Sequence, residues 1–173
     1  MSLSNLKRTV FALLTVLGIA GLSNPASAGG VYFGINLELM GGPLDLRFDK
    51  DFRIAPIPFP GVQIGYDFGD DGDGYGARLS FSFLIFGQIA ADVYHRFSLD
   101  ARGSNTYVGA GIEYQFLIFD TFAGAPALHA LAGLEWRATP NLGLFIEATP
   151  GILLQLPAVA FTVIVRSGLL LRF

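Results

Sequence analysis

The chain has 173 residues, of which 52% are hydrophobic and 14% are charged, and its formal net charge at pH 7 is −3. Soluble domains average about 25% charged residues, so this composition disfavours an ordinary soluble domain, and the net negative charge disfavours a nucleic-acid-binding protein. The chain has no cysteine, which excludes disulfides and a lipid anchor attached to cysteine.

The first 28 residues follow the pattern of a secretory signal peptide. Two basic residues and no acid precede an apolar core at residues 10–22, and Ala26-Ser27-Ala28 supplies small residues for cleavage. The alternative is an uncleaved membrane anchor, but this core is shorter than the about 20 residues that a spanning helix needs. We therefore expect a signal peptide over residues 1–28 and one domain over residues 29–173.

After the signal, apolar residues alternate with polar or small ones, which is the period of two that a β-strand produces. In the first such segment, Val31, Phe33 and Ile35 share one face. Tyr32 and Gly34 share the other face. Eight segments of this kind are predicted, at residues 31–40, 61–68, 75–86, 89–99, 106–116, 127–136, 142–149 and 161–173.

The connections between these segments are of two kinds. Three are short and polar, which suits tight turns on the periplasmic side, and they lie at residues 69–74, 100–105 and 137–141. The others are expected outside the cell, and they lie at residues 41–60, 87–88, 117–126 and 150–158. The aspartates of the first turn could suggest calcium, but the glutamate of a calcium-binding loop is missing, which favours a plain acidic turn.

The apolar face of the strands is predicted to meet lipid. No run after residue 28 is long and apolar enough for a spanning helix, and a closed barrel is the other structure that bonds every backbone group inside a membrane. The polar face is rich in glycine and short of charge. Aromatic residues lie near strand ends on the apolar face, as in an interfacial girdle, at Phe68, Tyr75, Phe97, Trp136 and Phe173. The alternative is a soluble, lipocalin-like barrel with its apolar face inside.

The last strand ends on Phe173, in phase with its apolar face. With the export signal and the eight amphipathic strands, this ending resembles the small eight-stranded bacterial outer-membrane β-barrels of the OmpA, OmpX and OmpW kind. The resemblance implies an all-β, antiparallel, up-and-down transmembrane barrel in the outer membrane of a Gram-negative-type bacterium. It also implies that the barrel-assembly machinery reads Phe173.

Six ionisable residues fall near one height inside the predicted barrel. They are Glu38, Asp92, Glu113, His129, Glu147 and Arg166. Strand order puts Arg166 between Glu147 and Glu38, so we expect it to pair with one or both, with Glu113 and Asp92 as the next candidates. Because an eight-stranded barrel is just wide enough for its own side chains, a structural ion-pair plug is favoured. The alternative is a path for cations or protons.

Four apolar side chains are predicted to point inward above this charged layer. They are Leu84, Phe86, Leu117 and Ile164. They could form a pocket that takes up an apolar solute and releases it sideways into the membrane. Alternatively, the strands extend and the apolar outer loops dip into lipid.

The sequence contains two candidate sets of catalytic residues, and neither is expected to lie where it could act on lipid. His129 with Ser80, Ser82 and Glu135 has the residue types of a nucleophile set, but these side chains are expected to face the lumen. His95 with Ser98 is expected on the outward face near the periplasm.

The sequence therefore predicts a monomeric outer-membrane barrel without cofactor or metal. Its partners are expected to be outer-membrane lipid and the assembly machinery. A structural or envelope-maintenance role is favoured. Passage or binding of small hydrophobic molecules is the first alternative, and a lipid-modifying enzyme is the second. The known members of the family serve such different roles that the fold does not choose among them.

Replacement of the terminal aromatic residue tests the resemblance. We expect Phe173→Ala and Phe173→Asp to be exported but to stall before membrane insertion, because the closing strand loses its terminal ring. Cell fractionation and a heat-modifiability gel measure this. Normal outer-membrane levels of a heat-modifiable Phe173→Asp protein would contradict the proposed recognition.

Overall fold

The computed structural model describes residues 30–42, 53–54, 58–69, 73–83, 86–101, 103–117, 120–155 and 158–173. The predicted signal peptide and Leu84 lie outside these residues. Within the described ranges, no helix is long and apolar enough to cross a membrane.

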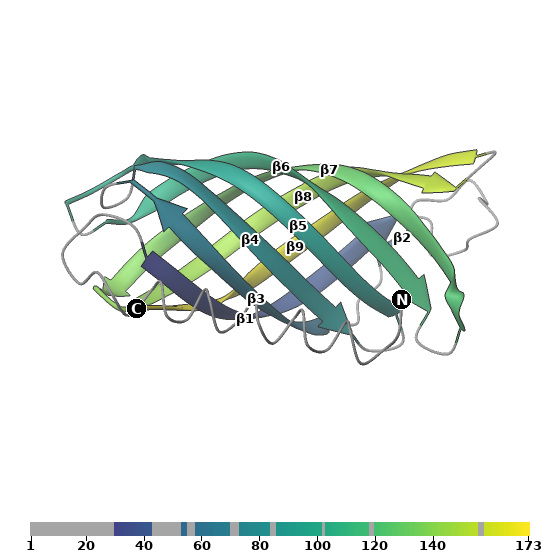
Figure 1. The fold of residues 1–173 in the computed structure, drawn as a ribbon, viewed down its shortest axis with the longest axis horizontal. Coiled ribbons are helices and arrows are strands. Elements are labelled where there is room, and N and C mark those ends of the chain that lie inside the picture. The colour runs from purple at the N-terminus through teal and green to yellow at the C-terminus, as the bar shows by residue number, and fades with distance from the viewer. Residues whose placement is uncertain are drawn as a thin grey trace, which may run out of the picture.

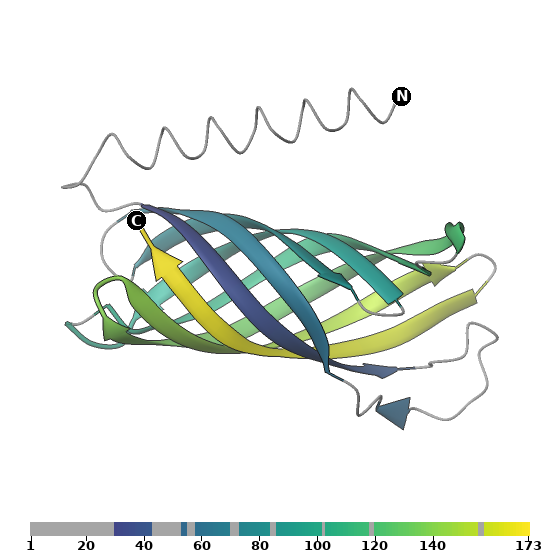
Figure 2. The same cartoon turned by 90° about the horizontal axis from the view of Figure 1, so that it is seen from below.

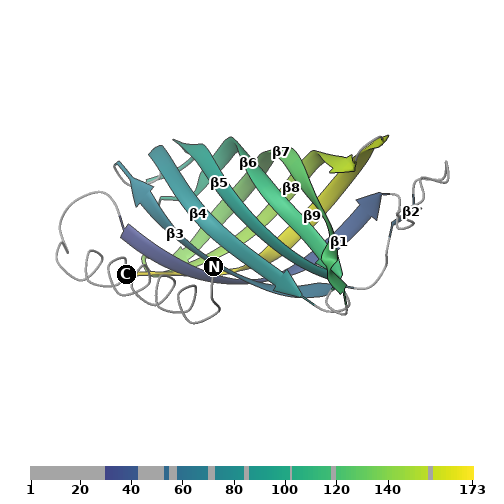
Figure 3. The same ribbon diagram turned by 45° about the vertical axis from the view of Figure 1, so that its right-hand side comes forward.

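Nine strands make up one antiparallel sheet (Figure 1). They are β1 (Gly30–Gly42), β2 (Arg53–Ile54), β3 (Phe59–Phe68), β4 (Gly74–Phe83), β5 (Phe86–Ser98), β6 (Asn105–Leu117), β7 (Asp120–Thr139), β8 (Leu142–Gln155) and β9 (Ala158–Arg172). The two-residue β2 pairs only with the end of β1 and lies outside the ring of strands (Figures 2 and 3). The other eight strands follow one another in chain order, and β9 pairs with β1 to close the barrel.

The predicted fold class is confirmed, because the chain is an all-β, closed, eight-stranded antiparallel barrel. The start of β1 and the C-terminus lie at one end of the cylinder (Figure 2). The Phe173 N–H donates to the Val31 carbonyl there at 3.0 Å. We call this end the base and the opposite end the rim. The turns that begin at residues 69, 99 and 140 also lie at the base, since they join the same ends of successive strands.

Three predicted connections are wrong. Residues 120–126 belong to β7, where the sequence predicts part of an outer loop. Residues 87–88 are not a connection, because they pair with β6 inside β5. The sequence also predicts that β8 ends before Pro150, but the strand continues to Gln155. A proline removes one backbone donor without ending a strand, and the ladder from β8 to β7 has a gap beside Pro150 but resumes at Gly151.

The apolar faces of the eight barrel strands point outward in the part of the chain that the structure describes, as predicted. Ile112 is 62% exposed and Ile35 is 51% exposed, although both lie in the middle of strands. The inner face carries the polar and charged side chains, and nearly all of these are buried. This arrangement is the reverse of a soluble barrel, so the lipocalin-like alternative is wrong.

Glycines on the inner wall make room for tyrosine rings. A Cβ atom at Gly65 would overlap the Tyr32 ring, and one at Gly76 would overlap the Tyr94 ring. Gly133 and the Tyr107 ring are related in the same way. These glycines therefore do not widen the lumen, because each is covered by an aromatic side chain from a neighbouring strand.

Arginine substitutions on the outer face test its contact with lipid. We expect Ile35→Arg, Phe81→Arg and Ile112→Arg each to cost about 2–4 kcal/mol if the side chain lies near the middle of the membrane, and Leu99→Arg to cost about 0–1 kcal/mol at its edge. Unfolding in urea from lipid vesicles measures the difference. Equal, small effects at all four positions would show that this face does not meet lipid.

Candidate functional site

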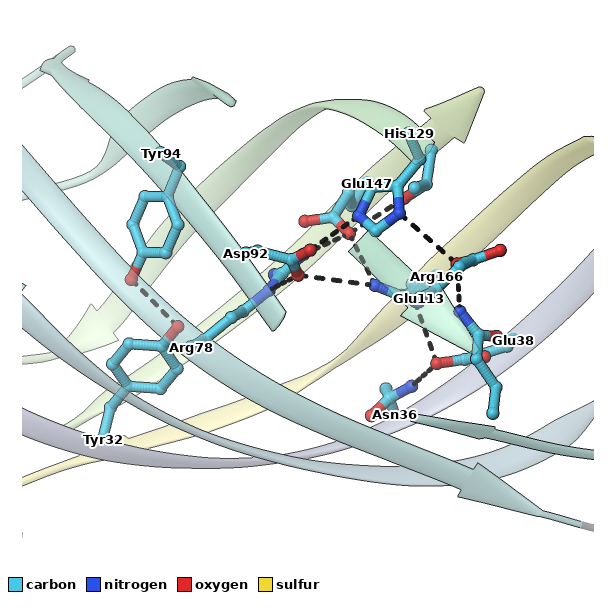
Figure 4. Close-up of polar contacts among 12 residues, drawn as sticks. Tyr32, Asn36, Glu38, Arg78, Asp92, Tyr94, Glu113, His129, Glu147 and Arg166 are labelled. Carbon is cyan, nitrogen blue, oxygen red and sulfur yellow. Dashed lines mark hydrogen bonds and ion pairs between the residues drawn. The ribbon is translucent and has the colours of Figure 1, made fainter. Parts of the chain in front are cut away.

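The lumen contains a central layer of seven buried ionisable side chains (Figure 4). They are Glu38, Arg78, Asp92, Glu113, His129, Glu147 and Arg166. The structure thus places all six of the residues singled out in the sequence inside the barrel, at one level, and adds a seventh.

Arg166 is fully buried and bridges two neighbouring strands. Its Nε lies 2.9 Å from Glu38 Oε1 on β1, and its Nη1 lies 3.3 Å from Glu147 Oε1 on β8. The register makes Arg166 the direct partner of both glutamates across the two ladders. Because a buried charge persists only when it is paired, these contacts hold Arg166 in the lumen.

Arg78 is the member of the central layer that sequence reasoning missed. Its Nε lies 2.7 Å from Asp92 Oδ2, and its Nη2 lies 2.6 Å from Glu147 Oε1. Glu147 therefore receives both guanidinium groups. Part of the signal was present in the sequence, because Arg78 falls on the polar face of its predicted strand. Its position directly opposite Asp92 is set by the β4–β5 register.

His129 contacts two carboxylates rather than a hydroxyl. Its Nε2 lies 2.6 Å from Asp92 Oδ1, and its Nδ1 lies 3.5 Å from Glu113 Oε2. Glu113 also accepts hydrogen bonds from the Gln88 and Gln115 amides at 2.5 and 2.6 Å. His129 is thus part of the ion-pair network.

Neither candidate nucleophile set is brought together. Glu135 lies at the other charged level of the lumen, where it binds Arg172. The outward His95 ring packs between Tyr75 and Phe97, each 4.6 Å away between ring centroids. Ser98 donates to the Asp100 carbonyl at 3.3 Å.

A tyrosine layer lies between the central layer and the base. It consists of Tyr32, Tyr94 and Tyr107, packed with Leu131, Phe145 and Leu170. The Tyr94 hydroxyl lies 2.7 Å from Asp67 Oδ1 and 2.9 Å from the Tyr32 hydroxyl. The guanidinium of Arg78 lies 5.9 Å from the centroid of the Tyr94 ring, and that of Arg172 lies 5.2 Å from the Tyr32 ring.

A second charged layer, which we call the basal layer, closes the lumen at the base. It consists of Asp67, Arg96, Glu135, Arg137 and Arg172. Arg172 binds Asp67 through Nη1, and its Nη2 lies 2.5 Å from Glu135 Oε2. Sequence reasoning did not identify this layer, although its members share the inner face near the ends of their strands.

The space between these layers is small. A gap of about 10 Å³ lies among Tyr32, Arg78, Arg96 and Arg172, which is room for about one water molecule. The described part of the lumen is therefore packed from the base to the central layer.

The predicted apolar pocket is only partly within the described residues. Leu84 lies outside them, and the side chains of Phe86 and Leu117 do as well. Ile164 points inward and is 1% exposed. Toward the rim from the central layer, the inner wall carries a buried apolar cluster formed by Ala125, Ala127, Leu153 and Ala160.

Metal ligation finds no support in the described ranges. No group of three or more histidine, aspartate or glutamate side chains there could hold a metal ion. Asp73 accepts a hydrogen bond from the Gly74 N–H at 2.9 Å, while Asp70 and Asp71 lie outside the described residues.

The sequence matches no protein-family model and no curated protein. Its fold is similar to solved structures of small outer-membrane barrels. Neisserial surface protein A shares 13% identity over 85% of this chain and 100% of its own, with a TM-score of 0.57. Ail, the attachment invasion locus protein of Yersinia pestis, shares 16% identity over 84% and 97% of the two chains, with a TM-score of 0.49.

The N-terminal β-barrel domain of Pseudomonas aeruginosa OprF shares 18% identity over 80% of this chain and 96% of its own, with a TM-score of 0.48. At these identities the likeness concerns the fold alone. The chain has the fold of the small eight-stranded outer-membrane barrels.

Removal of the central arginine tests the ion-pair network. We expect Arg166→Ala to destabilise the barrel by about 3–5 kcal/mol, because it leaves buried carboxylates without their counter-charge. Ser167→Ala, next in sequence but on the outer face, is the control and should stay within about 0.5 kcal/mol of the parent. Equal urea midpoints for the two variants would contradict the importance of the network.

Proposed function

We propose that this protein is a monomeric, non-conducting barrel of the bacterial outer membrane with a structural or envelope-maintenance role. The observation that carries this proposal is the packed lumen. The central layer, the tyrosine layer and the basal layer fill its cross-section in succession. An eight-stranded barrel has little interior beyond its own side chains, and here those side chains are cross-linked by ion pairs.

The placement in the outer membrane is supported by the outer surface. Every strand presents apolar side chains there, including Phe33, Leu79 and Ile146, and such a surface would be unfavourable in water. The expected signal peptide would export the chain, and the terminal aromatic residue would be read by the barrel-assembly machinery. The base, with its short polar turns, would then face the periplasm, and the lipid of the outer membrane would be the main partner.

A lipid-modifying enzyme is disfavoured. The polar residues with catalytic potential are engaged in the lumen, where lipid does not reach, and His95 on the outer face is packed between two aromatic rings. The residues of this chain therefore offer no assembled nucleophile and base in the described ranges.

Passage of small hydrophobic molecules is the second candidate, and the apolar wall near the rim favours it. The cluster of Ala125, Ala127, Leu153 and Ala160 gives this part of the lumen wall an apolar patch. A solute that entered here could not continue to the base through the charged layers, so it would have to leave sideways.

Planar-bilayer recording tests the absence of conduction. We expect the parent protein to give no channel steps. Replacing Tyr32, Tyr94 and Tyr107 together by alanine should produce steps, because it removes the packed layer between the two charged ones. Tyr75→Ala, which removes a tyrosine from the outer face, should remain silent.

The same protein in vesicles separates the candidates. Uptake of an apolar dye without conductance would support passage. The structural role would be supported by the absence of both activities, together with a deletion strain that is sensitive to detergent and regains resistance when the parent gene is supplied. Channel steps from the parent protein would overturn the proposal.

A further inference from the structure

The outer wall of the barrel carries a groove of about 690 Å³ across five strands, β4, β3, β1, β9 and β8. It follows one row of paired residues, whose backbone forms its floor: Gly61, Asn36, Gly168 and Phe145. Outward side chains of the two adjoining rows form its walls. One wall contains Val62, Ile35, Leu169 and Leu144, and the other contains Phe83, Pro60, Leu37 and Ser167.

The second wall is lower at Ser167 than at its neighbours, because the serine side chain is short. Ser167 lies opposite Leu37 on one side and Ile146 on the other. Its hydroxyl extends much less far than the leucine or isoleucine side chains of its neighbours, so the groove is open above it. No charged side chain lines the groove, so charged headgroups and acidic or basic peptides are poor matches for it.

The groove runs obliquely from the rim toward the base. It begins at Phe83 and Pro60, at the rim ends of β4 and β3, and ends at Leu144, two residues above the base end of β8. Four interstrand steps of about 4.8 Å, in strands tilted by roughly 40°, give a fall along the barrel axis on the order of 12 Å. This is about half of the roughly 25 Å apolar band of such barrels, which suits one hydrocarbon chain.

The two ends of the groove have different surroundings. At the base end, Leu144 is the direct partner of Trp136, a large ring that is half exposed on the outer face. At the rim end, the described lining ends with Phe83 and Pro60, at the ends of β4 and β3. In the proposed orientation this end would lie in the leaflet that faces the cell exterior, so a chain anchored in that leaflet would enter the groove there.

We propose that this groove binds one acyl chain of a lipid in the exterior leaflet. This inference rests on the proposed placement in the outer membrane. The groove is continuous with the apolar surface that would already meet lipid, so binding needs no partner other than the surrounding membrane. The chain would be held by apolar contact along its length, and its headgroup would lie outside the groove, beyond the rim end.

Filling the groove tests the proposal. Ser167→Phe places a ring in the low wall, and Ala110→Phe, on exposed outer surface of β6 away from the groove, is the matched control. Each protein is extracted from outer membranes in mild detergent, and the mass and occupancy of the retained lipid are measured by native mass spectrometry. We expect the parent and Ala110→Phe to retain one lipopolysaccharide-type lipid and Ser167→Phe to retain about tenfold less, equivalent to one decade in dissociation constant.

Several results would overturn the proposal. Equal retention by the two phenylalanine variants would do so, as would a periplasmic-leaflet phospholipid in place of the exterior lipid, or a second copy of the chain bound in the lipid's place. Fractionation of the same cells separates this failure from that of the proposed function. If the variants reside in the outer membrane but retain lipid equally, only the groove is refuted, whereas absence of the parent protein from that membrane refutes the placement.

Discussion

Closure of the sheet between β1 and β9 is the constraint on which the rest of the structure depends. The ladder from Tyr32–Arg172 to Gly41–Val163 pairs the first strand of the barrel with the last, so the ring of eight strands has no free edge. A membrane offers no water to bond an open edge. Because the barrel closes with only eight strands, its interior is just wide enough for side chains.

The narrow interior explains the chemistry of the lumen. Charged side chains that point inward have no bulk water to solvate them, so each must find a counter-charge or a hydrogen bond within reach. Glu147 is the counter-charge for arginines from two strands, since Arg78 on β4 and Arg166 on β9 both contact its Oε1. The tyrosine rings pack against glycines of the wall, and they separate one charged layer from the other.

The two surfaces of the barrel therefore suit different tasks. The lumen is packed with paired charges, which stabilise the barrel and leave no described path through it. The outer surface is apolar and varies in height, and where short residues such as Ser167 and Pro60 interrupt it, a lipid chain has a place to lie.

The sequence by itself determined the number of barrel strands, their inner and outer faces and the six ionisable residues of the lumen. These follow from the period of two, because a strand puts alternate residues on opposite faces whatever its neighbours are. The adjacency of Arg166 to Glu38 and Glu147 was also within reach, since it depends only on chain order and strand length.

Only the tertiary structure decided how the layers are completed. Whether Arg78 reaches Glu147, 69 residues away, depends on the stagger of the strands and on the rotamers of both side chains, and neither has a signature in the sequence. The close approach of the Tyr32 ring to Gly65 is of the same kind, as is the continuation of β8 through Pro150. The groove could not be predicted from the sequence for the same reason. Its lining residues come from five strands, and they are aligned side by side only by the register of the closed barrel.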